Sequence, residues 1–259
     1  MDEPNWTLVT GASSGIGAEI ARAFASRGRA MVLTARREDR LRALANELRG
    51  RVPVEVVPAD LTEADAPRAI LARLAERGIA LHTLVNNAGF GLRGRLVSHP
   101  EAEVAGMIAL NVAAPTMLAR LILPDLIARR RGGILNVASV VAYLPGPNMA
   151  VYHATKAYLL SLSEALHEEA RPHGVVVTAA CPGTTATEFN ARTDGPGAGP
   201  ASRRRRGGMS AEAVARIAVD GHCAGRAVVV TGLANRVAVL GARLAPRRLS
   251  RKVAARVQG

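Results

Sequence analysis

Tyr152 and Lys156 stand four residues apart in the segment VYHATKAY, and Ser139 lies thirteen residues before Tyr152, at the end of the apolar run ILNVAS. Positions i and i+4 share one face of a helix, so the phenol and the ammonium project side by side. A phenol titrates near ~10 in water, and a neighbouring cation favours the phenolate. A tyrosine so placed can exchange a proton with a substrate oxygen near neutral pH, and the hydroxyl of Ser139 could hold that oxygen.

Lysine is rare in this chain, which has 34 basic residues but only two lysines, Lys156 and Lys252. A compact ammonium therefore stands at position 156, where an arginine would present a broad, permanently charged fork. The same spacing also occurs in surface pairs without a function, so its meaning depends on the elements around it.

Short β-branched runs alternate with longer helical periods, a pattern typical of βαβ units on a parallel sheet. Strands are expected at 6–10, 30–34, 54–58, 82–86, 134–139, 175–180 and 227–231. Helices are expected at about 15–27, 38–49, 63–77, 101–130, 151–171 and 210–223. These elements predict an α/β fold of the doubly wound Rossmann type, with a seven-stranded, mostly parallel sheet and helices on both faces. Ligands of such folds bind beyond the carboxyl ends of the strands.

The length of 259 residues predicts one main α/β domain, residues 1–232, with a mobile substrate lid at about 187–208 and a basic amphipathic C-terminal extension at 233–259. Apolar residues make up 49% of the chain but aromatic residues only 3%, so the core must be aliphatic. Cys181 and Cys223 show no metal-ligand spacing, which favours free thiols in a reducing compartment and no metal site.

The N-terminal segment MDEPNWTLVT is acidic and runs directly into a strand, so no signal peptide is expected. No apolar stretch is expected to reach the ~20 residues that a membrane-spanning helix needs. We therefore expect a cytoplasmic protein.

A glycine-rich turn, TGASSGIG at Thr10–Gly17, follows the first predicted strand and opens the first predicted helix. Gly11 allows a tight turn, while Gly15 and Gly17 let backbone amides and the helix N-terminus approach a pyrophosphate. The position of this turn predicts a dinucleotide site.

The end of the second strand indicates which dinucleotide is bound. An acidic residue ~20 positions beyond the glycines would bind a free ribose 2′-hydroxyl. Thr34 and Ala35 occupy that place, and Arg36 and Arg37 follow. Guanidinium groups suit a 2′-phosphate, so NADP(H) is favoured over NAD(H), although two arginines could also simply begin a solvated helix.

In its ordered motifs the chain resembles the short-chain dehydrogenase/reductase family, in the single-domain form of ~250 residues. The resemblance runs from about Thr7 to Thr231. It rests on TGASSGIG, the Asp60–Leu61–Thr62 segment, NNAG at 86–89, Asn111, Ser139, the Tyr152–Lys156 pair and PGTTAT at 182–187. The family implies an oxidoreductase that binds a nicotinamide dinucleotide and forms homodimers or homotetramers through its long central helices.

The resemblance also implies a role for each matching residue. Tyr152 would be the general acid in carbonyl reduction, Lys156 would hold the nicotinamide ribose and lower the tyrosine pKa, and Ser139 would orient the carbonyl. Asn111 would kink its helix and anchor a water that relays protons. Asp60 would bind the adenine amine. The other expected cofactor contacts are Ser13, Ser14, Ile16, Leu61, Asn87, Ala88, Gly89, Pro182, Gly183, Thr185 and Thr187.

The substrate pocket is expected to be walled by Phe90, Val141, Leu144, Asn148 and Phe189, together with Gly91, Leu92, Pro145, Met149 and Thr184. These walls are mostly apolar, which favours a neutral or lipophilic carbonyl compound, either a ketone or a 3-oxoacyl compound.

Positive charge is concentrated near the C-terminus: residues 190–259 carry 14 basic and three acidic residues of a chain whose net charge is +13. The RRRR run at 203–206 could dock an anionic handle such as an acyl carrier, or could be a solvated loop. The extension could lie on an anionic membrane surface, or could pack on the protein body or a neighbouring subunit.

Two other classes of function remain open at this stage. A dinucleotide-binding regulator without catalysis would fit the glycine turn, but the complete Ser139, Tyr152, Lys156 and Asn111 set argues against it. A nucleic-acid binder acting through the tail is not expected, because recognised modules are absent and the tail has no aromatic residue for base stacking.

Overall fold

The computed structural model describes residues 5–189, 193, 208–246, 248, 251 and 254. Its centre is a seven-stranded sheet with the order β3-β2-β1-β4-β5-β6-β7, and every neighbouring pair is parallel. The strands are β1 (Trp6–Thr10), β2 (Ala30–Thr34), β3 (Val54–Val56), β4 (Leu81–Asn86), β5 (Gly133–Val137), β6 (Val176–Cys181) and β7 (Val228–Val230). The predicted doubly wound α/β fold is therefore confirmed.

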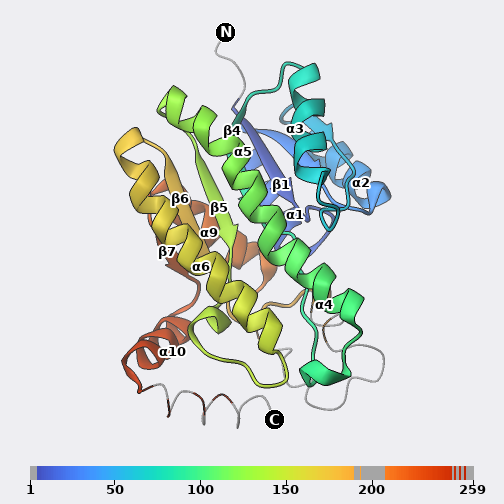
Figure 1. Cartoon of the computed structure of the whole chain (residues 1–259). Coiled ribbons are helices and arrows are strands. Elements are labelled where there is room, and N and C mark those ends of the chain that lie inside the picture. The colour runs from blue at the N-terminus through green and yellow to red at the C-terminus, as the bar shows by residue number, and fades with distance from the viewer. Residues whose placement is uncertain are drawn as a thin grey trace.

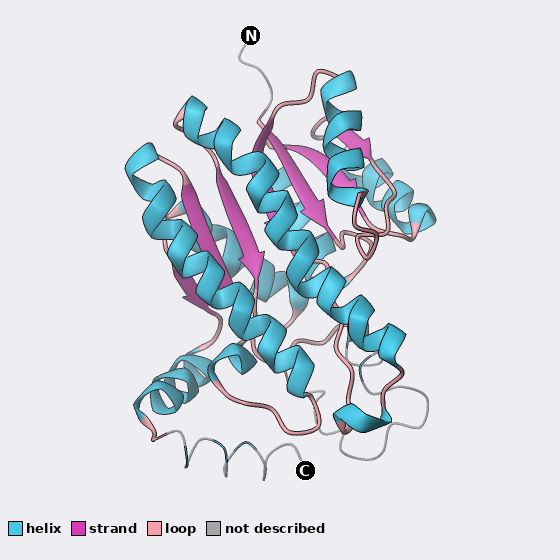
Figure 2. Ribbon diagram, in the orientation of Figure 1, coloured by secondary structure: helices cyan, strands magenta, loops and turns pink. Residues whose placement is uncertain are grey.

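Helices cover both faces of this sheet (Figures 1 and 2). One face carries α1 (Gly15–Ala25), α2 (Glu38–Leu48) and α9 (Ala211–Cys223). The other carries α3 (Ala66–Glu76), α4 (Glu101–Ile108), α5 (Ala114–Arg129) and α6 (Ala150–Ala170). Each layer buries its own aliphatic cluster against the sheet, the first around Ile20, Leu33 and Leu41 and the second around Leu84, Leu118 and Ile134. The core is aliphatic, as the low aromatic content predicts.

The helix predicted at 101–130 is interrupted by a π-helical turn, η2 (Ala109–Ala113), between α4 and α5. Contrary to the expectation from the sequence, the segment Glu101–Arg129 is long and apolar enough to cross a membrane by length and composition alone. Here its α5 part packs on β4 and α3 and buries Leu118 and Leu126, so we interpret it as a core helix of the α/β domain.

The carboxyl ends of the strands lie together at the lower edge of the sheet in Figure 1. The strand order reverses between β1 and β4, where a doubly wound sheet opens a crevice for its ligand. The glycine turn follows β1, Asn87 follows β4, Ser139 follows β5 and Pro182 follows β6. The topology thus brings the predicted motifs to one edge.

The C-terminal extension begins with α10 (Leu233–Leu244), which lies beyond the strand ends near β7 (Figure 1). Of the chain after Pro246, the structure describes Arg248, Arg251 and Ala254. Most of the predicted lid, residues 190–192 and 194–207 with the RRRR run, lies outside the described residues. Cys181 and Cys223 are both free thiols.

Candidate active site

Tyr152 and Lys156 lie on the first turns of α6, and Ser139 precedes the short 3-10 helix η3 (Val140–Tyr143). All three side chains are buried, with exposed fractions of 5–8%. Lys156 Nζ lies 5.9 Å from the centroid of the Tyr152 ring and donates a 2.7 Å hydrogen bond to the carbonyl of Val137 at the end of β5. The three groups that the sequence separates by up to seventeen positions therefore share one enclosed site.

Burial dominates the electrostatics of this site. It raises the pKa of Tyr152, and the hydrogen bond with Ser139 acts in the opposite direction. Burial lowers the pKa of Lys156 to about 8. The phenol is thus protonated at neutral pH and can donate a proton. The pKa of Lys156 lies only slightly above neutral pH, so its ammonium is still mostly charged there. The predicted lowering of the tyrosine pKa by Lys156 stays a prediction.

Asn111 occupies the middle of the π-helical turn η2 and is 1% exposed. Its Oδ1 accepts a 3.1 Å hydrogen bond from the backbone N–H of Phe90, and its Nδ2 donates to the Phe90 carbonyl at 2.9 Å and to Thr155 Oγ1 at 3.1 Å. The amide therefore links α4–α5 to the segment after β4 and to α6. The kink expected at Asn111 is present as this π turn; its role in a water relay stays a prediction.

The glycine turn is shaped to accept a ligand from the strand ends. Gly11 has φ +67°, and a Cβ there would lie 2.9 Å from the backbone of Ala88; a Cβ on Gly17 would lie 2.3 Å from Asn87 Nδ2. Asn87 Nδ2 donates to the carbonyls of Thr10 (2.9 Å) and Gly11 (3.3 Å), which ties the turn to β4. The Ser14 side chain makes no capping hydrogen bond at the N-terminus of α1, so amides of the first turn are available to an anion. These features fit a dinucleotide pyrophosphate.

The two arginines expected at a 2′-phosphate each contact a carboxylate. Arg36 lies 3.6 Å from Asp60 Oδ2, and Arg37 Nη1 donates to Glu188 Oε2 at 2.9 Å. Arg37 Nη2 also donates to Ser14 Oγ at 2.8 Å and Ser13 Oγ at 3.1 Å. Asp60 accepts from the Thr62 amide and hydroxyl at 3.0 and 2.8 Å.

Glu188 was missed by the sequence analysis. Its second oxygen accepts from Arg40 Nη1 at 2.5 Å, and hydrogen bonds from Arg40 and Arg37 lower the pKa of Glu188 to about 2. A carboxylate from the chain after β6 thus shares the guanidinium of Arg37 across the cleft. No local pattern signals a pairing between residues 151 positions apart.

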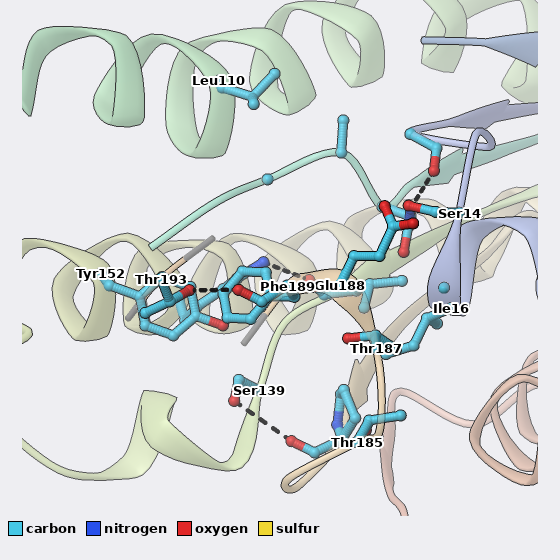
Figure 3. A pocket seen from close by; sticks show the side chains of 18 of the residues that line it. Ser14, Ile16, Leu110, Ser139, Tyr152, Thr185, Thr187, Glu188, Phe189 and Thr193 are labelled. Atoms are coloured by element: carbon cyan, nitrogen blue, oxygen red, sulfur yellow. Dashed lines mark hydrogen bonds between the residues drawn. The ribbon is translucent and has the colours of Figure 1, made fainter. Parts of the chain in front are cut away.

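A cleft of about 630 Å³ has Arg36, Asp60 and Tyr152 in its lining. Figure 3 shows part of it, with Ser14 and Tyr152 at a distance from each other along the pocket. Most of the predicted site residues line it: Gly11, Ser13, Ser14, Gly15, Ile16, Arg36, Arg37, Asp60, Leu61, Asn87, Ala88, Gly89, Val141, Ser139, Tyr152, Lys156, Pro182, Gly183, Thr185, Thr187 and Phe189. Gly17 and Asn111 are not lining residues. Gly17 packs closely against Asn87, and Asn111 accepts a hydrogen bond from the backbone of Phe90, so both lie in the layer next to the lining.

Six of the ten predicted substrate-wall residues are also not among the lining residues that the structure describes: Phe90, Gly91, Leu92, Leu144, Pro145 and Asn148. Phe90 is 8% exposed and packs with Met107, Met149 and Tyr152 in a small cluster behind the wall. Val141, Met149 and Phe189 do line the cleft, and the Phe189 ring lies 5.4 Å from that of Tyr152. Arg93, Leu110 and Thr193 are further lining residues that the sequence analysis missed. Arg93 gives this end of the cleft a cation that we had not expected.

Within the described part of the chain, no group of three or more His, Cys, Asp or Glu side chains could hold a metal ion.

The site combines a proton donor, a buried cation, a hydroxyl and a dinucleotide-shaped crevice. This combination defines a nicotinamide-dinucleotide-dependent oxidoreductase of the Rossmann type.

Comparison with known proteins supports the same class. The family model for short chain dehydrogenases matches residues 5–195, and the chain belongs to the short-chain dehydrogenase/reductase family. A sulfoacetaldehyde reductase from Chromohalobacter salexigens is 39% identical over 191 residues, which cover 73% of this chain and 76% of that protein. A very-long-chain 3-oxoacyl-CoA reductase from Bos taurus is 33% identical over 71% of this chain and 60% of its own length.

A solved structure gives the same picture for the fold. A short-chain dehydrogenase from Sphingobium yanoikuyae in complex with NADPH has a TM-score of 0.81 and 37% identity, with 92% of this chain and 93% of that chain covered. The protein is thus an oxidoreductase of this family.

Proposed function

We propose that this protein is an NADP(H)-dependent reductase that converts the carbonyl of a lipophilic ketone or 3-oxoacyl compound to an alcohol. The observation that carries the proposal is the enclosed group of Ser139, Tyr152 and Lys156 at the end of the cleft.

When bound, the dinucleotide supplies the hydride for this reaction. Ser139 Oγ holds the substrate oxygen, and Tyr152 Oη donates a proton to it; burial keeps the phenol protonated until the substrate arrives. Lys156 would provide a buried cation for the ribose hydroxyls, and Gly11, Gly15 and the N-terminus of α1 would hold the pyrophosphate. Val141 and Phe189 exclude water from the reacting end.

The preference for NADP(H) rests on the residues, because solved relatives include complexes with NADPH and with NAD. Arg37 with Ser13 and Ser14 offers a cation and two hydroxyls at the adenosine end of the cleft. The described residues lining that end contain no acid at the close of β2, where a free 2′-hydroxyl would need one.

The substrate class rests on the apolar side chains around Tyr152, namely Leu110, Val141, Met149 and Phe189. The relative from Bos taurus is named for a long acyl substrate and the one from Chromohalobacter salexigens for a small sulfonated aldehyde. Arg93 in the cleft lining could bind an anionic group such as a sulfonate, so the test includes both lipophilic carbonyl compounds and a sulfonated aldehyde.

The experiment is NADPH oxidation with ketones and 3-oxoacyl thioesters of increasing chain length and with sulfoacetaldehyde. Rates should rise with chain length, and Tyr152→Phe should lower them by about 10²- to 10⁴-fold while NADPH binding, followed by fluorescence titration, stays within about twofold. Tyr158→Phe, an exposed tyrosine of the same helix that contacts Thr116, is the matched control and should keep its activity. Retained activity in Tyr152→Phe would refute the acid role. Turnover of sulfoacetaldehyde alone would refute the lipophilic substrate class.

We further propose that the protein acts in the cytoplasm as a homodimer or homotetramer on a small-molecule substrate. Support comes from an exposed apolar face on α4, α5 and α6 that carries Ile108, Met117 and Tyr158, with exposed fractions of 45%, 37% and 39%.

A further inference from the structure

Helix α10 has an inner stripe that packs on the protein body and an outer apolar stripe that does not. The inner side chains Asn235, Val239 and Ala242 are half-buried or buried. The outer stripe consists of Leu233, Val237, Leu240 and Leu244, which are 77%, 65%, 58% and 78% exposed. At about 100° per residue these four side chains fall within a sector of about 60°, on the side of the helix away from the inner stripe. Four large aliphatic side chains in one row therefore face solvent.

The inner side holds α10 firmly to the catalytic domain. Asn235 Nδ2 donates to the Thr231 carbonyl at 2.6 Å, and Arg236 Nε donates to the Val230 carbonyl at 3.1 Å. Arg243 reaches Glu164 on α6 at 3.3 Å and lies over the Tyr143 ring at 5.0 Å. The outer stripe is therefore presented in a fixed orientation.

The chain around the outer stripe is basic, although Glu164 of α6 pairs with Arg243. After Asp220 the chain contains eight basic residues and no acid. Among the described ones, Arg236 and Arg243 lie on α10 beside the outer stripe, and Arg248 and Arg251 follow the helix as exposed residues. An exposed row of aliphatic side chains bordered by arginines fits a surface that is apolar inside and anionic outside.

A second copy of this chain fits the outer stripe poorly. In a two-fold symmetric contact the same patch meets itself, so the basic segments of both subunits would face each other. Like charges brought together at an interface oppose association. Charge complementarity therefore favours an anionic partner surface.

We propose that the outer stripe of α10 docks the protein on the surface of membranes that contain anionic phospholipids. The four aliphatic side chains enter the headgroup region while the exposed Arg248 and Arg251 contact lipid phosphates.

Docking through α10 would also place the membrane near the cleft. Gly183 lines the cleft, and a Cβ at that position would lie 2.4 Å from Asn235 Nδ2, so α10 packs directly behind the wall of the site. If the substrate is lipophilic, as the proposed function holds, this arrangement shortens its path from the bilayer.

The test is co-sedimentation of the full chain with vesicles of phosphatidylcholine alone and with vesicles containing about one third phosphatidylglycerol. We expect binding to the anionic vesicles, weaker binding to the neutral ones, and loss of binding as salt is raised. Val237→Glu with Leu240→Glu should lower the partition coefficient at least about tenfold. Arg248→Gln with Arg251→Gln should weaken binding to anionic vesicles only.

The matched control is Val97→Glu, which changes an aliphatic residue that is 93% exposed outside α10 and should leave binding unchanged. All of these positions are exposed, so the variants should keep the wild-type circular dichroism. Absence of wild-type binding to anionic vesicles, or equal binding by Val237→Glu with Leu240→Glu, would overturn the docking proposal. Turnover of a soluble ketone without vesicles tests the proposed function separately, because the α10 variants should retain it.

Discussion

At the scale of single residues, the adenosine end of the cleft places a carboxylate where a phosphate is expected. Arg37 shares its guanidinium between Ser14 and Glu188, and Arg40 holds the other oxygen of Glu188. A ribose 2′-phosphate and the Glu188 carboxylate would compete for the same donor groups. Glu188 would then reduce the preference for NADPH over NADH that Arg37 confers.

This competition predicts opposite effects for two substitutions. Arg36→Ala with Arg37→Ala should weaken the binding of NADPH by about 10- to 100-fold and the binding of NADH much less, because only NADPH loses charged hydrogen bonds to its 2′-phosphate. Glu188→Gln should strengthen NADPH binding by about two- to fivefold, a small effect because the ion pair that it breaks is solvent-exposed. NADH binding should not change, because NADH has no 2′-phosphate to compete for Arg37. Dissociation constants from fluorescence titration measure both effects.

The control for these titrations is Glu38→Gln, which breaks the exposed pair with Arg42 on the same helix and should change neither constant. Equal losses of NADPH and NADH in the double arginine variant would contradict the phosphate assignment. Weaker NADPH binding in Glu188→Gln would contradict the proposed competition between Glu188 and the 2′-phosphate for Arg37.

At the scale of elements, the π turn η2 positions one buried amide for three hydrogen bonds. Asn111→Leu should leave the Phe90 amide, the Phe90 carbonyl and Thr155 Oγ1 with fewer partners in the interior. Each buried group left unsatisfied costs about 1–3 kcal/mol, so we expect a loss of roughly 3 kcal/mol and a fall in Tm of about 6–12 °C. Thermal unfolding followed by circular dichroism measures it.

The control for Asn111→Leu is Ala113→Ser, an exposed position in the same π turn, which should leave Tm unchanged. An unchanged Tm in Asn111→Leu would mean that the π turn does not depend on this amide.

The elements also show how far the sequence could predict the site. The strands and the glycine turn were predictable because their signals are local: β-branched runs, glycines at a fixed spacing and a helix start. The Arg37–Glu188 contact and the place of Arg93 were not, because each depends on segments far apart in the chain. Phe90, Leu144 and Asn148 are not among the lining residues, and residue type alone does not tell a cleft wall from the packing behind it.

At the scale of the whole molecule, two exposed apolar surfaces differ in charge. The outer stripe of α10 lies in a segment without acids. The face of α4, α5 and α6 has a shallow hollow lined by Ile108, Val112, Ala150, Val151, Ala154 and Thr155. The lining of this hollow carries no charged side chain, so a two-fold contact here brings no like charges together. This face suits self-association, whereas α10 suits an anionic surface.

This difference predicts that one substitution separates the two surfaces. Ala154 is exposed, so Ala154→Arg should fold normally, but it would place two arginines against each other in a symmetric contact. Light scattering after gel filtration should give a dimer or tetramer of the 27.1 kDa chain for the wild type and a monomer for Ala154→Arg. Val237→Glu with Leu240→Glu should keep the wild-type mass, because α10 takes no part in this contact. A monomeric wild type, or an unchanged mass in Ala154→Arg, would exclude the α4–α6 face as the interface; a change of mass in the α10 variant instead would assign the self-contact to α10.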